Sequence, residues 1–209
     1  AQKNFAAEQA SNDWILNLDA DERISPQLGA DIQRIKAANR EPPYAGFEMP
    51  RLTSYLGRWI KHSGWYPDYK LRLYDRRKGK WRGDFVHESV TVSGAVERLA
   101  GEILHYTIRS ASEHHLRMDR YTTLAAQELR SKGVSPSVLS LCTSPISAFV
   151  RSYFFKLGFL DRVPGLAIAY FAGHYAFLKH LKLWEMSRDI TDADESRSSV
   201  DDHANGELP

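Results

Sequence analysis

The chain has 209 residues, of which 43% are hydrophobic and 26% charged, a composition typical of one sizeable globular domain, alone or with an appendage. A single cysteine, Cys142, excludes a disulfide framework and a cysteine-rich zinc site. The formal net charge is +2, but residues 188–209 hold seven acids and two bases, which leaves 26 bases and 19 acids in the rest. A basic body suits phosphate-bearing partners such as nucleotides, anionic lipids or nucleic acid.

Residues 2–12 have the pattern of the end of a helix, and residues 14–18 form a short apolar run that predicts a buried strand. Asp19, Asp21 and Glu22 follow this strand. On an extended backbone, Asp19 and Asp21 would point the same way because they are two positions apart. In an open α/β sheet, ligands bind at the carboxyl ends of the strands.

Two converging carboxylates suit Mg²⁺, which takes one or two protein carboxylates and completes its shell with water and substrate phosphates. The stretch from Asp19 to Glu22 therefore predicts a metal held against a diphosphate, with an ordinary solvated turn as the alternative. A calcium-binding EF-hand loop is excluded, because Ile24 and Ala30 stand where that loop needs glycine and glutamate.

The next segments alternate between one helix and several strands. Ser25 is the predicted N-cap of a helix that begins at Pro26, with Leu28, Ile32 and Ile35 on its buried face. Alternating apolar residues predict strands at 46–50, 69–74 and 86–92, and a short strand at 103–106. Residues 76–80 form a basic turn, for which a solvated hairpin tip and a functional surface are both open interpretations.

From Ser110 onward the pattern is helical. The first helix should run to about Lys132 and end at Gly133, with one side formed by His114, Met118, Tyr121 and Ala125. Pro136 and Pro145 indicate a loop, after which residues 146–157 and 166–186 predict two aromatic-rich helices.

The uncharged run at 163–178 is shorter than the roughly 20 residues that a membrane-spanning helix needs. We therefore expect an amphipathic hairpin on a membrane surface, with Lys and Arg toward the lipid head groups. Packing of its aromatics on the main domain is the alternative. The acidic tail, which lacks apolar periodicity, should be disordered.

Three motifs in this order resemble glycosyltransferase family 2: the Leu-Asp-Ala-Asp-Glu segment at 18–22, Trp-Tyr-Pro-Asp-Tyr-Lys-Leu-Arg-Leu-Tyr at 65–74, and Val-His-Glu at 86–88. The chain is most similar to the bacterial branch that adds glucose in β-1,4 linkage to the inner core of lipopolysaccharide. Residues 158–161 and 177–179 resemble the C-terminal region of the same branch. The resemblance covers most of residues 1–184.

The resemblance implies an α/β fold of the GT-A type, a nucleotide-sugar donor, a divalent metal and an inverting mechanism. Members of the family begin with an apolar strand and an Asn-Glu turn that grips uridine, and nothing here matches it. We therefore expect an N-terminally truncated GT-A domain: residues 1–109 its C-terminal portion, 110–187 a helical membrane-surface region, and 188–209 the disordered tail.

The same resemblance assigns roles to individual residues. Asp19 and Asp21 would hold Mg²⁺ or Mn²⁺ on the donor diphosphate, with Asp21 preferred, and His87 would complete the metal shell or contact phosphate. Glu88 is the first choice for the base that deprotonates the acceptor hydroxyl, and Asp68 is the second. Arg72 and Lys70 would face the diphosphate, unless Arg72 only pairs with a surface acid. His105, on a short apolar strand, is expected to be a core histidine.

The implied partners are a donor such as UDP-glucose, a lipid-linked saccharide acceptor and the membrane surface. The implied location is the cytoplasmic face of the bacterial inner membrane, as a peripheral protein. Nucleic acid is not expected, because the basic residues are scattered and no nucleic-acid motif is present.

Two other functions compete with this one. A phosphohydrolase of the haloacid dehalogenase type is disfavoured, because Glu22-Arg23 follows the acids and no later Gly-Asp-x-x-x-Asp motif occurs. A non-catalytic basic module of the membrane surface is the other alternative. Metal-dependent binding of a uridine diphosphate sugar would distinguish it from a transferase.

Overall fold

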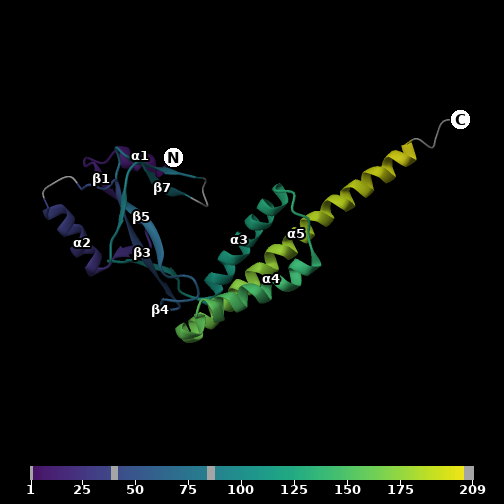
Figure 1. Cartoon of the computed structure of the whole chain (residues 1–209). Helices are drawn as coiled ribbons and strands as arrows, with labels where there is room; N and C mark the ends of the chain where they lie inside the picture. Colours follow the sequence, from purple (N-terminus) through teal and green to yellow (C-terminus); the bar gives the residue numbers. More distant parts are fainter. Residues whose placement is uncertain (1, 39–41, 84–87, 205–209) are drawn as a thin grey trace. The chain divides into compact units, whose positions relative to one another are not determined.

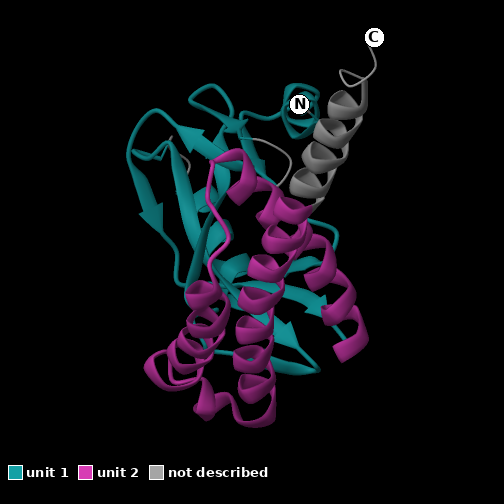
Figure 2. Cartoon of the chain, turned by 90° about the vertical axis from the view of Figure 1, so that its right-hand side faces the viewer, with its two compact units in different colours: residues 1–109 teal, residues 110–209 magenta. Residues whose placement is uncertain are grey.

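The computed structural model describes residues 2–38, 42–83 and 88–204, with side chains as far as Arg188. The chain divides into two compact units, residues 1–109 and 110–209, which Figure 2 shows in teal and magenta. The first unit is mixed α/β and the second is helical. The α/β class predicted for the first part of the chain is therefore confirmed.

The first unit is built on a mixed sheet (Figure 1), in which β1 (Trp14–Leu16), β5 (Asp68–Asp75), β3 (Gly46–Tyr55), β9 (Ile103–Ile108) and β2 (Glu22–Ile24) follow one another. Strands β4 (Arg58–Ile60) and β8 (Val96–Arg98) also pair with β3. Among the described strands, β9 and β8 run parallel to β3, and the other pairings are antiparallel.

A separate antiparallel ribbon consists of β6 (Gly79–Arg82) and β7 (Ser89–Val92). The strands predicted at 46–50, 69–74, 86–92 and 103–106 correspond to β3, β5, β7 and β9. Residues 86 and 87 of the third prediction lie outside the described residues.

Helix α2 (Pro26–Ala37) begins as predicted. The Ser25 hydroxyl accepts a hydrogen bond from the Leu28 amide at 3.1 Å, and Pro26 occupies the first turn, where its missing N–H costs nothing. Leu28 is fully buried in a core cluster with Phe47, Met49, Leu73 and Ile103, against which Ile32 and Ile35 also pack. The short helix α1 (Gln2–Glu8) precedes β1.

The second unit starts with α3 (Ala111–Ser131), which Ser110 caps through a 3.1 Å bond from the Glu113 amide. Gly133 ends the turn that follows with a φ of +71°, a conformation that glycine adopts at low cost. The buried stripe is Met118, Thr122 and Ala126. The predicted stripe was therefore shifted, since Tyr121 is 49% exposed.

Three further segments complete this unit: α4 (Val138–Val150) with the π-helical turn η1 (Arg151–Phe155), the 3₁₀ turn η2 (Gly158–Asp161), and α5 (Arg162–Ala204). The predicted start at 146 was wrong, because α4 begins eight residues earlier with Pro145 inside it. Helix α5 continues into the acidic segment for which the sequence predicts disorder. Its side chains beyond Arg188 lie outside the described ones.

One helical segment of the described residues, Val138–Phe155, is long and apolar enough to cross a membrane by length and composition. The core helix of a soluble protein can pass the same test, but only 6% of this segment is buried. Its exposed apolar side chains include Val138, Leu139, Ile146, Phe154 and Phe155. The early start of α4 thus gives a longer apolar run than the sequence analysis recognised.

Candidate active site

The acidic stretch after β1 forms a turn. Strand β1 ends at Leu16, and the Glu22 amide donates to the Asp19 carbonyl at 2.9 Å before β2 begins. Both strands pair antiparallel with their neighbours, β1 with β5 and β2 with β9. The expectation that Asp19 and Asp21 lie on an extended backbone and point the same way was therefore wrong. Their side chains contact different strands.

Arg72, on β5, is the centre of the first group of contacts. It is 6% exposed, and its Nη2 donates to Asp19 Oδ2 at 2.5 Å and to Glu22 Oε1 at 3.1 Å. The Glu22 side chain is fully buried, and its Oε2 accepts from the Asp19 amide at 3.0 Å. Arg72 thus holds the acidic turn against β5, whereas the sequence analysis had also considered a surface acid as its partner.

Lys3 of α1 brings a further carboxylate into this group. Its Nζ lies 3.2 Å from Asp19 and 3.9 Å from Glu88, and it stands 4.1 Å above the Trp81 ring. Burial alone would raise the pKa of Asp19, but the positive charges and hydrogen bonds of Arg72 and Lys3 outweigh it and lower that pKa. Asp19 is therefore ionised at neutral pH.

Arg51 of β3 connects the buried acid Glu22 to the other candidate base. Its Nη1 lies 3.5 Å from Glu22 Oε1. Its Nε and Nη2 donate to Asp68 Oδ2 at 3.0 and 2.7 Å, and Lys70 lies 2.9 Å from the other oxygen of Asp68. A continuous series of contacts therefore joins Glu88 and Lys3 through Asp19, Arg72, Glu22 and Arg51 to Asp68 and Lys70.

Asp21 has a different partner. Its Oδ2 lies 3.3 Å from His105 Nε2, and His105 Nδ1 lies 3.4 Å from the Thr53 hydroxyl. Burial, with the nearby Arg51 charge, lowers the pKa of His105, so the imidazole is neutral at pH 7 and can donate from Nε2 to the carboxylate. His105 is largely buried and has hydrogen-bonding partners, as its apolar strand predicts, and one of these partners is Asp21. The predicted His87 lies outside the described residues.

Lys3, Arg51, Trp81 and His105 were not among the predicted site residues. Lys3 and Arg51 carry no local motif, and each contacts carboxylates that are remote in the sequence. Arg51 directly follows the strand predicted at 46–50, and a basic residue in that position gives only a general indication of pairing with a carboxylate.

The described residues provide no group of three or more His, Cys, Asp and Glu side chains able to hold a metal ion. Asp19 is engaged by two cations, while the Asp21 side chain is 42% exposed. These side chains fit a hard cation held mainly by one carboxylate, with water and diphosphate oxygens completing its shell, which is a common arrangement for Mg²⁺. They do not fit a metal cage made only of protein ligands.

No protein-family model matches the chain. The chain is 30% identical over 203 residues to lipopolysaccharide core biosynthesis glycosyltransferase LpsC of Rhizobium meliloti, covering 96% of this chain and 73% of the relative. It is 28% identical over 196 residues to an uncharacterized glycosyltransferase of Rickettsia typhi and 27% identical over 196 residues to one of Rickettsia prowazekii. Each of these two matches covers 89% of this chain and 67% of the relative.

The relatives are named glycosyltransferases, and the first unit of this chain is a mixed α/β unit with a cluster of carboxylates and cations. Together these findings place the chain among sugar-transferring enzymes. The chain belongs to the bacterial glycosyltransferase family that includes the lipopolysaccharide core enzyme of Rhizobium meliloti.

Proposed function

We propose that the chain is the catalytic part of an inverting, metal-dependent glycosyltransferase with a GT-A fold. It transfers glucose from UDP-glucose to a lipid-linked saccharide such as lipopolysaccharide core. The observation that carries the proposal is the connected group around Arg72, which joins Asp19 of the acidic turn to Glu88 through Lys3. Residues predicted separately for the donor and for the base thus belong to one cluster.

The proposed reaction is a single displacement at the anomeric carbon. The acceptor hydroxyl oxygen attacks this carbon from the face opposite the diphosphate and forms the new glycosidic bond. The bond between the anomeric carbon and the diphosphate oxygen breaks, and its electron pair leaves with the nucleoside diphosphate. The hydroxyl proton passes to a protein carboxylate that acts as general base.

Glu88 suits the base better than Asp68. Asp68 accepts two hydrogen bonds from Arg51 on one carboxylate oxygen, and its other oxygen lies 2.9 Å from Lys70, so both oxygens already have charged partners. Among the described residues, the charged contact of Glu88 is a 3.9 Å approach to Lys3, and its side chain is 29% exposed. The two side chains are similarly exposed, so the difference lies in their partners: the more weakly paired Glu88 is freer to reach the acceptor hydroxyl.

The divalent metal would be held by Asp21, with Asp19 next to it in the turn, and when bound it would neutralise charge on the leaving diphosphate. The protein side chains have separate tasks. His105 orients Asp21, and Arg72 fixes Asp19 and Glu22 so that the turn keeps its shape. Lys70 and Lys3 supply positive charge at the edge of the group.

The helical unit would bring the enzyme to its lipid-linked acceptor. Apolar side chains of α4 and η1 are exposed, as expected for insertion into a membrane surface. We propose a peripheral location on the cytoplasmic face of the bacterial inner membrane. A non-catalytic membrane module, the alternative function, would use the same exposed apolar surface but would need no donor site.

The decisive experiment is transfer from radiolabelled UDP-glucose to purified lipid-linked core saccharide by the full-length protein, with Mg²⁺ or Mn²⁺ and with a chelator. We expect transfer only with metal, and a product whose anomeric configuration, read by NMR, is inverted relative to the donor. Equal transfer rates with metal and with chelator would show that the reaction does not need a divalent metal. Vesicle binding without any metal-dependent donor binding or transfer would favour the non-catalytic module.

A further inference from the structure

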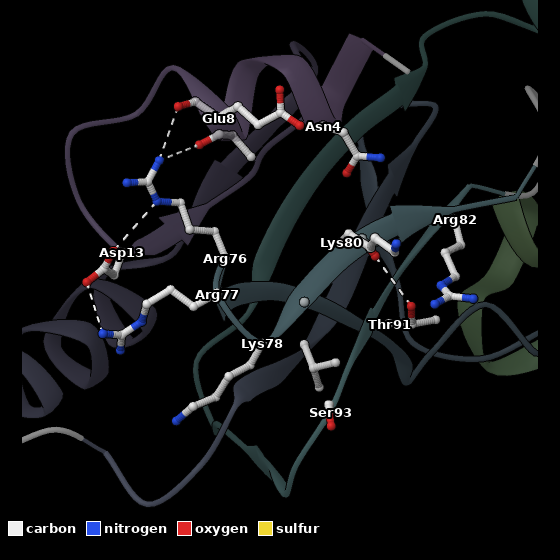
Figure 3. A pocket seen from close by; sticks show the side chains of 13 residues that line it. Asn4, Glu8, Asp13, Arg76, Arg77, Lys78, Lys80, Arg82, Thr91 and Ser93 are labelled. Carbon is white, nitrogen blue, oxygen red and sulfur yellow. Dashed lines mark hydrogen bonds and ion pairs between the residues drawn. The ribbon is translucent and has the colours of Figure 1, made fainter.

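The first unit has a second polar site in addition to the Arg72 group. It is a depression of about 1040 Å³ between α1, the turn after β5, and the β6–β7 ribbon (Figure 3). Asp19, Asp21 and Glu88 are not among its lining residues. The basic turn at residues 76–80 therefore forms part of a concave surface.

The depression carries an excess of positive charge. Five bases line it, namely Arg76, Arg77, Lys78, Lys80 and Arg82, against two acids, Glu8 and Asp13. Such an excess in a concave surface raises the local concentration of anions.

Two of the arginines are held in place by the surrounding backbone and acids. Arg76 Nη1 donates to the carbonyls of Ala7 and Glu8 at 3.2 Å each. Arg77 donates from Nε and Nη2 to the buried Asp75 and lies 3.2 Å from Asp13. Hydrogen bonds from Arg77, outweighing burial, lower the pKa of Asp75, so this anchor stays charged at neutral pH. These contacts fix one wall of the depression before any ligand binds.

The opposite wall carries charges that the described protein does not neutralise. Lys80 and Arg82 are exposed and lie on the same side of β6, because the buried Trp81 separates them. Neither makes an ion pair with any residue that the structure describes, and Figure 3 shows no dashed line from either side-chain nitrogen. Two like charges two positions apart repel each other, and a bound anion would relieve this repulsion.

The remaining lining is polar. Thr91 lies opposite Lys80 in the ribbon, and the Ser93 amide is tied to the Lys78 carbonyl at 2.8 Å, so two hydroxyl-bearing residues flank the basic side chains. The apolar lining residues are small or medium-sized, namely Ala7 and Val92. The site therefore suits a hydrophilic anion better than an acyl chain.

We propose that this depression binds a phosphate-bearing ligand, at a site separate from the sugar-transfer site. Arginine guanidinium groups match the geometry of phosphate oxygens in pairs, and lysine adds a mobile positive charge. The phosphate belongs either to a soluble phosphate ester or to a lipid head group. This inference goes beyond the proposed transfer reaction, and its test does not require activity.

The test measures binding of inorganic pyrophosphate to the full-length protein by calorimetry, in a chelator and in an Asp21→Asn background. These conditions remove binding that depends on a metal at the transfer site. We expect the double variant Lys80→Ala/Arg82→Ala to bind at least about 10-fold more weakly, since it removes two of the five bases that line the depression. The control Lys36→Ala/Arg58→Ala loses the same charge from exposed positions elsewhere on this unit and should bind normally.

Equal affinities of the double variant and the control, or no binding by the parent protein, would overturn the proposal. Thermal unfolding of both variants checks that the fold is intact, and Lys80→Gln/Arg82→Gln should repeat the loss if the charges are responsible. Phosphatidylcholine vesicles with and without phosphatidylglycerol then distinguish the source. If only the vesicles that contain phosphatidylglycerol displace pyrophosphate, the ligand is a lipid head group. If neither kind of vesicle displaces it, the ligand is a soluble phosphate ester.

Discussion

Arg72 and Asp19 are 53 positions apart in the chain, and a 2.5 Å hydrogen bond joins them. The same Nη2 reaches the fully buried Glu22, so one guanidinium group secures both ends of the acidic turn. The proposed donor site therefore depends on a long-range contact between β5 and the segment before β2.

Arg72→Ala should destabilise the protein strongly. Among the residues that the structure describes, removal of Arg72 leaves the buried Glu22 with the more distant Arg51 as its charged partner. Loss of one member of a buried pair costs about 3–5 kcal/mol. Urea unfolding of the full-length variant measures the loss. Arg98→Ala is the control, because its partner Glu48 is near the surface and such pairs contribute about 0–1 kcal/mol. Similar losses for both variants would contradict the central role of Arg72.

Asp21→Asn should abolish transfer and leave the fold intact. The carboxylate is partly exposed, and among the described residues its charged contact is the one with His105, so its loss should cost little stability. Removal of one charge from a metal site that relies on it should lower metal affinity or turnover by at least about 10- to 100-fold. Metal titrations of transfer rate measure this effect, with Glu97→Gln on β8 as a control. Normal turnover at saturating metal would exclude Asp21 as a ligand.

Glu88→Gln should separate binding from chemistry. The amide keeps the size of the side chain but cannot accept the acceptor proton, so turnover should fall by roughly 100-fold or more while donor binding stays near normal. Asp68→Asn is the matched comparison. It should affect stability more than Glu88→Gln does, because it weakens the contacts with Arg51 and Lys70. If Asp68→Asn loses transfer activity and Glu88→Gln keeps it, Asp68 rather than Glu88 is the general base.

The helical unit should attach the protein to membranes. In cell fractionation, the full-length protein should pellet with membranes and be released by detergent or alkaline carbonate, whereas a version ending near Val134 should stay soluble. Phe154→Ser/Phe155→Ser should weaken the attachment, because these exposed rings are 55% and 77% accessible. If both lengths stay soluble, the membrane proposal fails. If the intact protein resists carbonate, the apolar segment Val138–Phe155 spans the bilayer, contrary to the peripheral assignment.

The helical unit should also lose stability in mild acid. His114 of α3 packs against Phe171 of α5 with ring centroids 4.0 Å apart, and burial, with the nearby Arg117, lowers its pKa. The unfolded chain then binds the proton more readily, so the stabilisation is complete above the unfolded pKa of about 6.5 and decreases as the pH falls below it. The difference in urea midpoint between wild type and His114→Gln should therefore shrink from pH 7.5 to pH 5.5. A constant difference would contradict the prediction.

Local sequence patterns were sufficient to predict the helices and strands whose formation depends on residues adjacent in the chain. Ser25 and Pro26 begin α2 as predicted, and the alternation at 69–74 marks β5. The same reasoning failed at Pro145, because proline usually ends a helix but here lies within α4. At this point α5 packs closely on α4, since a Cβ added to Gly173 would meet the Pro145 carbonyl oxygen at 2.9 Å.

The candidate site was only partly predictable, for a different reason. The acids of the turn and the segment around Arg72 were recognisable as motifs, but their partners depend on which strands lie side by side. Lys3 reaches Asp19 across 16 positions, and His105 meets Asp21 because β2 pairs with β9. Such contacts follow from sheet order, which the periodicity of a single strand does not determine.

The opposing charges around Arg72 have a kinetic consequence. Five carboxylates (Asp19, Asp21, Glu22, Asp68 and Glu88) stand among four cations (Lys3, Arg51, Lys70 and Arg72). Such a nearly balanced cluster exerts little long-range attraction on a negatively charged nucleotide. The association rate of the donor should therefore vary little with ionic strength, whereas anions should reach the basic depression more slowly as salt screens its unbalanced charge.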